Sequence, residues 1–110
     1  MSQDSLRKKK EFDQVFASGH SFYSPILGIK AHKNELELNR FGIIISTKIS
    51  KKAVIRNRLR RQIREILRHS LPKTENNYDL VIIVLDKIIG KEFGEIKEVL
   101  LKTYQSLRLK

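Results

Sequence analysis

The chain has 110 residues, 40% of them apolar, and a formal net charge of +11 from 23 Lys and Arg against 12 Asp and Glu. This length predicts a single domain over residues 1–110 with one modest core. The absence of cysteine excludes disulfides and a thiolate zinc site. No apolar run approaches the roughly 18 residues of a membrane-spanning helix, so we expect a cytoplasmic protein with no membrane partner. The excess of positive charge favours a polyanion as the partner.

The first predicted element is a helix near the N-terminus. Phe12 and Phe16 lie at i and i+4 and predict one apolar face of this helix. We expect Asp4 or Ser5 to be its N-cap, and Gly19 suits its C-terminal cap. The two aromatic residues fit either a core position or a partly exposed position that stacks on bases.

Strands and a closing helix are predicted from the rest of the pattern. Residues 21–33 lose the helical period and alternate between apolar and polar, as extended structure does. The polar segment 33–39 is expected to be a hairpin connection to a buried strand at 40–47. Residues 78–85 predict a central strand, and 96–107 predict an amphipathic helix. The predicted order is helix, two or three strands, helix, strand, helix.

Residues 53–68 carry a clear helical pattern. Its apolar stripe consists of Ile55, Leu59, Ile63, Ile66 and Leu67. At about 100° per residue, the stripe is followed around the helix by Arg56, Arg60, Arg64 and Asn57, then by Arg68 and Arg61, with Arg58 nearer the far edge. We expect one face of this helix to pack on the sheet and a basic arc to border that face.

Most of the net charge lies in this helix and just before it. Eight Lys and Arg between residues 51 and 68, against Glu65 alone, leave +7 of the total of +11. A solvated face is the usual explanation of a charge run, but such a face normally mixes signs to gain i, i+4 pairs. Guanidinium groups bind phosphate oxygens in bidentate fashion and stack on bases, so the pattern favours a nucleic-acid backbone. Asn57 can donate to and accept from a nucleotide or a metal-bound water.

The run from Ser46 to Glu65 closely resembles the signature of the bacterial ribonuclease P protein family. The features that match are the triplet Arg56-Asn57-Arg58, a basic pair after it, and then Arg64-Glu65. The spacing of the aromatic residues before Gly19 also resembles the family's first helix. The resemblance covers nearly the whole chain.

This resemblance implies an α+β fold, an α/β sandwich like the second domain of ribosomal protein S5, in the order α-β-β-β-α-β-α. It also implies a left-handed βαβ crossover around the arginine-rich helix. The handedness comes from the family alone, because the ordinary expectation for such a unit is right-handed.

The resemblance further implies a subunit of the endoribonuclease ribonuclease P, a ribonucleoprotein of tRNA processing. The expected partners are the ribonuclease P RNA subunit and precursor tRNA, with no small-molecule substrate. In the family, RNA catalyses removal of the 5′ leader with Mg²⁺ at the RNA active site, and the protein recognises the leader. The protein alone is not expected to cleave.

Site residues follow from the resemblance position by position. The implied leader-binding residues are Phe12, Phe16, Lys30, Arg56, Asn57, Arg60 and Arg64. The implied contacts to the catalytic RNA are Lys51, Lys52, Arg58, Arg61 and Arg68. Lys30 stands where the family usually carries a tyrosine facing the cleft, and Tyr23 is a candidate to replace that tyrosine.

The sequence is also compatible with two other classes of function. A general RNA-binding or ribosome-binding module would share the charge, but it would not prefer precursor over mature tRNA. A stand-alone nuclease would need acidic metal ligands, for which Asp79 and Asp86 flank the last strand. No catalytic triad, carboxylate pair or metal-ligand spacing stands out, so we assign no catalytic or metal-binding residue to the chain.

Overall fold

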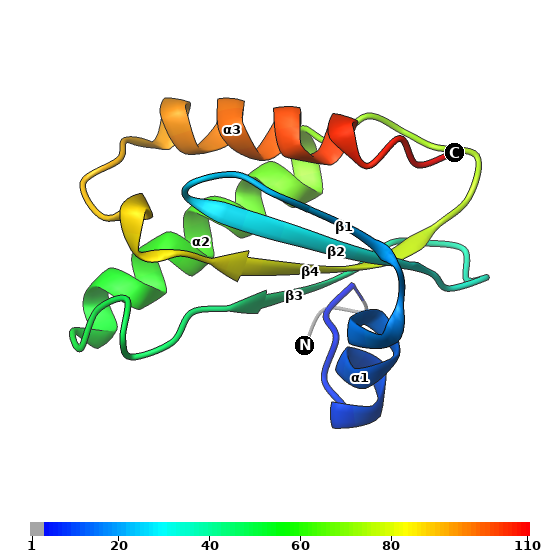
Figure 1. The fold of residues 1–110 in the computed structure, drawn as a ribbon, viewed down its shortest axis with the longest axis horizontal. Helices are drawn as coiled ribbons and strands as arrows, with labels where there is room; N and C mark the ends of the chain where they lie inside the picture. The colour runs from blue at the N-terminus through cyan, green and yellow to red at the C-terminus, as the bar shows by residue number, and fades with distance from the viewer. Residues whose placement is uncertain (1–3) are drawn as a thin grey trace.

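A computed structural model of the chain describes residues 4–110. Three α-helices and a four-stranded sheet make up the fold (Figure 1). The elements are α1 (Lys9–Ala17), β1 (His20–Tyr23), β2 (Leu27–Lys33), β3 (Arg40–Ile44), α2 (Ala53–His69), β4 (Tyr78–Val84), the 3-10 turn η1 (Asp86–Ile88) and α3 (Phe93–Ser106). This is the predicted α+β order, and its strands lie in the sheet order β1-β2-β4-β3.

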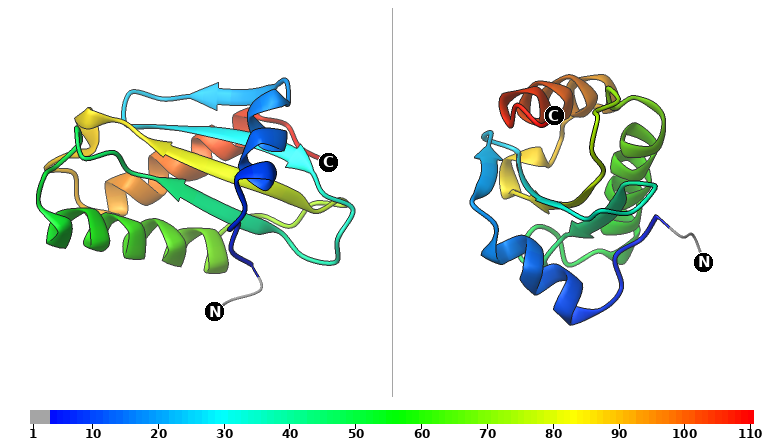
Figure 2. Two further views of the ribbon diagram at one scale, coloured as in Figure 1. Left: turned by 90° about the horizontal axis from the view of Figure 1, so that it is seen from below. Right: turned by 90° about the vertical axis from the view of Figure 1, so that its right-hand side faces the viewer.

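The sheet separates two layers of helix. Helices α2 and α3 lie on one face, and α1 lies on the other (Figures 1 and 2). In β4, Leu80 and Ile82 face the larger core with α2 and α3, whereas Val81 faces α1. The sequence predicted this central strand: because β4 is covered on both faces, its residues from Leu80 to Val84 are all apolar.

The β3–α2–β4 unit joins two adjacent parallel strands through the basic helix. With α2 toward the viewer and both strands pointing up, β4 lies to the left of β3, so the crossover is left-handed (Figures 1 and 2). This agrees with the fold that the family resemblance implied. It places the first turns of α2 beside the end of the sheet where β3 and β4 terminate.

The predicted hairpin over residues 33–39 is wrong. β2 and β3 do not pair, because β4 lies between them, antiparallel to β2 and parallel to β3. The polar connection from β2 to β3 therefore passes the end of β4, which lies between these two strands. The alternation in the sequence identified both strands, but local turn chemistry carries no information on a strand inserted from 35 or more residues later.

The caps predicted for the first helix are also wrong. The helix begins at Lys9, and Ser5 instead forms a parallel bridge to Phe41 at the edge of the sheet. The Glu11 side chain accepts hydrogen bonds from the backbone N–H groups of Lys8 and Arg7, each at 2.9 Å, and so satisfies donors at the start of the helix. At the other end Ser18 is the C-cap in extended conformation, and residue 19 has no positive φ.

Two contacts fix α1 on the sheet. The Phe12 ring lies against Gly42 of β3, where an added Cβ would come within 2.5 Å of the ring. The Arg40 side chain links the helix to the sheet, since it pairs with Glu11 of α1 and with Asp79 of β4. These contacts determine where α1 presents its exposed residues.

Candidate nucleic-acid interface

Helix α2 presents its arginines in two environments. Leu59 and Ile63 are buried on the sheet, as the apolar stripe predicted. Half-buried arginines border the stripe on one side, and exposed cations lie beyond them. The half-buried set is Arg56, Arg60 and Arg64, and the exposed set is Arg58, Arg61 and Arg68, with Asn57 also exposed. The burial of the arginines matches the division that the helical wheel predicted, whereas Asn57, which the wheel placed beside the buried stripe, is exposed.

Three of the six arginines on α2 have no hydrogen-bond or ion-pair partner among the described residues. Within residues 4–110, Arg58, Arg61 and Arg64 make neither a hydrogen bond nor an ion pair. The one carboxylate on the helix, Glu65, lies 3.8 Å from His69. Like charges along one helix repel each other, and a polyanion would relieve that repulsion.

Two arginines in the N-terminal half of α2 make hydrogen bonds. Arg56 Nη1 donates to the Ser50 carbonyl at 2.8 Å, which ties the helix to the loop that precedes it. Arg60 Nη1 donates to Asn57 Oδ1 at 3.2 Å, one turn apart on the same helix. The Asn57 amide is thereby oriented with its NH₂ group left to donate.

Arg68 differs from the other predicted RNA contacts. It donates from two nitrogens to the Asp4 carboxylate, at 2.9 and 3.0 Å. This fork joins the last turn of α2 to the segment that runs along β3. Lys51 and Lys52, which precede α2, are exposed. The geometry therefore leaves the lysines open to a partner and gives Arg68 a structural contact.

The face of the sheet under α1 carries the other predicted residues. Phe12 is half-buried against Gly42, whereas Phe16 is 41% exposed. Lys30 points to this same face, because its neighbours along β2 face the core. The Tyr23 ring lies over Gly28 on that face, 47% exposed, with Lys30 Nζ at 5.8 Å from its centroid. The exposed Tyr23 ring and the Lys30 ammonium thus lie together on the face of the sheet that α1 covers, and Phe16 belongs to that helix.

The acidic residues considered for a nuclease site serve other roles. Asp79 is 1% exposed, and its carboxylate is held by Arg40 and by Asn34 Nδ2 at 3.0 Å. Asp86 begins the 3-10 turn at the surface. In the part of the chain that the structure describes, no three His, Cys, Asp or Glu come together in a way that could hold a metal ion. The Arg40 cluster was missed from the sequence, although an acid inside the apolar run of β4 signals a buried partner.

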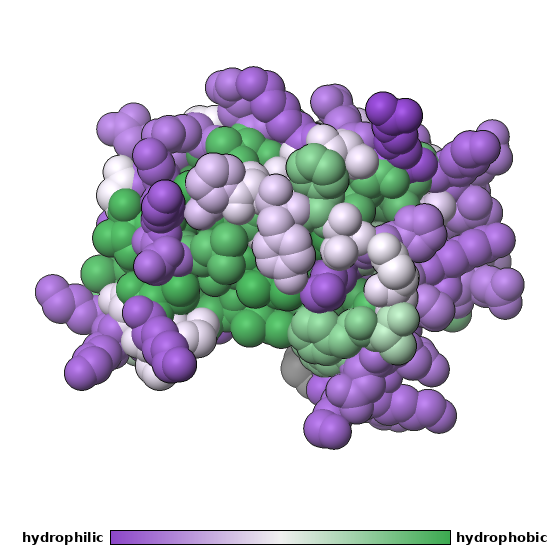
Figure 3. Space-filling view, in the orientation of Figure 1, coloured by the Kyte–Doolittle hydropathy of each residue, from purple (hydrophilic) through white to green (hydrophobic). Residues whose placement is uncertain are grey.

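Helix α2 and its arginines lie on the side of the molecule away from β1 (Figure 2). Seen from the side of β1, apolar and weakly polar side chains gather in the middle and hydrophilic ones surround them (Figure 3). Helix α2 lies at the opposite edge of the sheet, behind β3 in that view (Figure 2). The charge that the sequence placed in residues 51–68 is therefore separated from the face of β1.

Comparison with known proteins agrees with this geometry. A family model described as Ribonuclease P matches residues 1–108. The ribonuclease P protein component of Clostridium botulinum (strain 657 / Type Ba4) is 34% identical over 102 residues, which cover 92% of this chain and 91% of the relative. The chain belongs to the ribonuclease P protein family. It is thus a protein subunit of an RNA-processing endoribonuclease. This enzyme is a ribonucleoprotein that acts in tRNA processing.

Solved structures of ribonuclease P proteins share the fold. The protein from Thermotoga maritima superposes with a TM-score of 0.80 at 29% identity, over 98% of this chain and 99% of that one. The protein from Staphylococcus aureus gives a TM-score of 0.85 at 22% identity, over 98% of each chain, and supports the fold alone. Within residues 4–110, no helix of this family member combines the length and apolar character needed to cross a bilayer.

Proposed function

We propose that the protein binds the catalytic RNA of ribonuclease P and the 5′ leader of precursor tRNA, and thereby promotes endonucleolytic removal of the leader. The product is the mature tRNA 5′ end. In this proposal the RNA subunit performs the hydrolysis, and the complex acts in the cytoplasm. The observation that carries it is the uncompensated arginine surface of α2, which borders the sheet on one side and solvent on the other.

The half-buried arginines and the α1 face support a leader-binding role. Single-stranded RNA is recognised by aromatic rings that stack on bases and by cations that follow the backbone. Phe16 and Tyr23 offer exposed rings, and Lys30 places a cation beside one of them. In this proposal Tyr23 replaces the tyrosine that the family usually carries at the position of Lys30. In the same proposal Arg60 and Arg64 bind leader phosphates from α2, at the β3 edge of the sheet.

The exposed cations support a second contact, to the catalytic RNA. Arg58 and Arg61 are exposed on α2, and the exposed Lys51 and Lys52 come directly before the helix. Each phosphate that they neutralise releases a counterion, so assembly is expected to weaken steeply with salt. One helix can in this way bind two RNAs on two sides.

Mg²⁺ enters this proposal through the RNA. The carboxylates of Asp79 and Glu11 do not suit a metal, because both are already paired with Arg40. The protein's own contribution is to neutralise phosphate charge where the leader and the catalytic RNA come together. This reduces the repulsion between the two RNAs that Mg²⁺ must otherwise screen.

The test is reconstitution with the ribonuclease P RNA of the same organism at low Mg²⁺ and physiological salt. We expect precursor tRNA to be cleaved rapidly by RNA and protein together, slowly by RNA alone, and not by protein alone. Equal rates with and without the protein would contradict the proposal, and cleavage without RNA would indicate a nuclease. A Tyr23→Leu variant should weaken leader affinity at unchanged salt dependence, whereas Lys30→Gln should lower the salt slope by about 1.

A further inference from the structure

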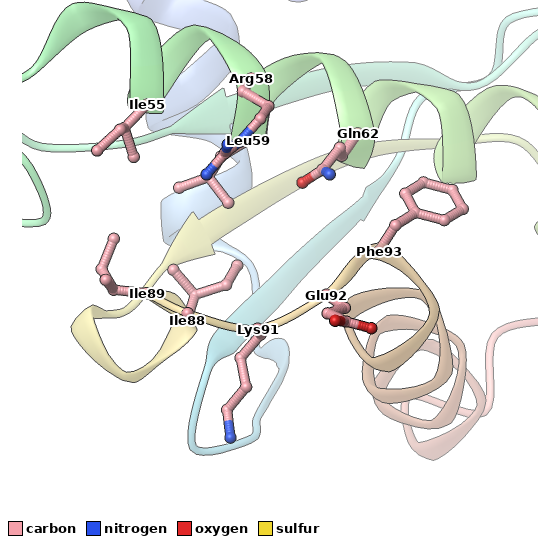
Figure 4. A pocket seen from close by; sticks show the side chains of 10 residues that line it. Ile55, Arg58, Leu59, Gln62, Ile88, Ile89, Lys91, Glu92 and Phe93 are labelled. Carbon is pink, nitrogen blue, oxygen red and sulfur yellow. The ribbon is translucent and has the colours of Figure 1, made fainter.

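A cavity of about 360 Å³ lies between the first half of α2 and the segment that joins η1 to α3. Its walls are Ile55, Arg58 and Gln62 from the helix and Ile89, Glu92 and Phe93 from the segment (Figure 4). The side chains of Arg58 and Gln62 project from α2 toward η1, and the Phe93 ring closes the far end. Of these residues, the sequence pointed to Arg58 as a site residue and to Ile55 as part of the apolar stripe, and to none of the others.

The walls are apolar but the rim is polar. Ile89 is 47% exposed, and Ile55 and Phe93 are half-buried against the core. Among residues 4–110, Arg58 and Gln62 make no hydrogen bond, so their polar groups are available to a ligand. Lys91 points away from the cavity and lies 3.3 Å from Glu95.

This combination suits a nucleobase better than a phosphate or a purely apolar ligand. A base is flat and apolar on its faces, and donates and accepts at its edge. Glu92 would repel a phosphate placed in the cavity, but its carboxylate can accept from an exocyclic amine. The Gln62 amide can both donate and accept, and the Arg58 guanidinium can stack on a base or bind the adjoining phosphate.

We propose that this cavity receives an unpaired nucleotide of the ribonuclease P RNA, with its base between Ile89 and Phe93 and its phosphate near Arg58. The proposal rests on the proposed function, because it places the site on the side of α2 assigned to the catalytic RNA. Two observations carry it: the cavity combines apolar walls with the polar groups of Arg58 and Gln62, and Arg58, an exposed cation of α2, makes no ion pair within the described residues. An amine-bearing base is expected, since Glu92 provides an acceptor.

The test compares two substitutions of equal charge at positions of nearly equal exposure. Ile89→Asp introduces a carboxylate into the cavity, whereas Leu36→Asp introduces one at a residue that is 45% exposed. The connection that contains Leu36 lies at the opposite end of the molecule from η1 (Figure 1). We expect Ile89→Asp to weaken affinity for the ribonuclease P RNA about tenfold or more, and Leu36→Asp to change it less than twofold.

A second pair of measurements separates base binding from general damage to the fold. Phe93→Leu keeps an apolar side chain on the core but removes the flat ring, and it should weaken RNA affinity by about fivefold. Because the chain has no cysteine, the Ile89→Cys variant has a single thiol, and a photoreactive group can be attached at that position alone. It should crosslink to a nucleotide that is unpaired in the free RNA.

The outcomes distinguish this site from the wider proposal. If wild-type protein binds the RNA tightly but Ile89→Asp behaves as Leu36→Asp, or if crosslinks map only to paired nucleotides, the cavity is not a nucleotide site and the proposed function stands. If wild-type protein does not bind the RNA, both proposals are wrong.

Discussion

Arg40, the first residue of β3, forks onto the carboxylate of Asp79 in β4, with Nε at 2.8 Å from Oδ1 and Nη2 at 2.7 Å from Oδ2. The same guanidinium reaches Glu11 on α1. One side chain therefore connects the edge strand, the central strand and the helix that carries the predicted leader-binding aromatics. Since Asp79 is buried, loss of Arg40 would leave its carboxylate without its main hydrogen-bond donors.

Removing Arg40 should destabilise the fold strongly. Arg40→Met leaves a buried carboxylate without its main partner, and we expect the free energy of unfolding in urea to fall by about 3–5 kcal/mol. Lys33→Met, which removes an exposed cation from β2, is the control and should change it by less than about 0.5 kcal/mol. The double variant Arg40→Met, Asp79→Leu should recover most of the loss. A loss below about 1 kcal/mol in the single variant would show that the cluster does not hold the sheet.

Stability should also depend on pH through Glu11. Backbone N–H groups of Lys8 and Arg7 and the Arg40 guanidinium lower the pKa of Glu11 from 4.5 to about 2. A lowered folded-state pKa means that the contribution is complete above pH 4.5 and is lost as the pH falls toward 2. Glu11→Gln should therefore be less stable than wild type near neutral pH, with a smaller decline between about pH 5 and pH 2. The free energy of unfolding is measured by urea titration at each pH, and an equal decline with falling pH in wild type and Glu11→Gln would contradict this prediction. The control is Glu75→Gln, which changes an exposed glutamate and should follow wild type.

The position of α1 on the sheet depends on the absence of a Cβ at Gly42. A Cβ at this position would lie 2.5 Å from the Phe12 ring, so the ring or the helix must shift. We expect Gly42→Ala to cost about 1–3 kcal/mol of stability and to weaken leader affinity, because Phe16 moves with the helix. Gly19→Ala is a matched control near the end of α1, where a Cβ meets nothing within 4 Å. Similar leader affinity for both variants would argue against a role for the position of α1.

Local patterns in the sequence determined more of this fold than long-range ones did. The stripe through Leu59 and Ile63 predicted α2 and its orientation on the sheet, because burial repeats with the helical period. The insertion of β4 between β2 and β3 was not predictable, since pairing partners far apart in sequence leave no local signal. The late start of α1 was missed for a related reason: Asp4 and Ser5 contact β3 and α2 instead of capping a helix.

The candidate site shows the same difference between features set by local spacing and features set by long-range contacts. The wheel separated Arg60 and Arg64 from Arg58 and Arg61, because position around a helix follows from spacing alone. The cavity beside Arg58 depends on where residues 88–93 fold back against α2, which spacing cannot indicate. The fork between Arg68 and Asp4 likewise joins residues 64 positions apart.

The two sides of α2 should respond differently to substitution. Arg60→Ala and Arg64→Ala should chiefly weaken affinity for the leader, measured as binding of precursor tRNA to the assembled complex. Arg58→Ala and Arg61→Ala should chiefly weaken assembly with the RNA subunit, and each lost phosphate contact should lower the salt slope by about 1. Identical profiles for the two pairs would contradict the assignment of two surfaces.

The central claim is that the protein recognises the 5′ leader within the ribonuclease P complex. The most direct measurement is a titration of precursor tRNA and mature tRNA with the complex reconstituted with and without the protein, at fixed Mg²⁺ and physiological salt. We predict that the protein raises affinity for precursor tRNA and leaves affinity for mature tRNA nearly unchanged. An equal gain for both tRNAs would contradict leader recognition and indicate a general RNA-binding module.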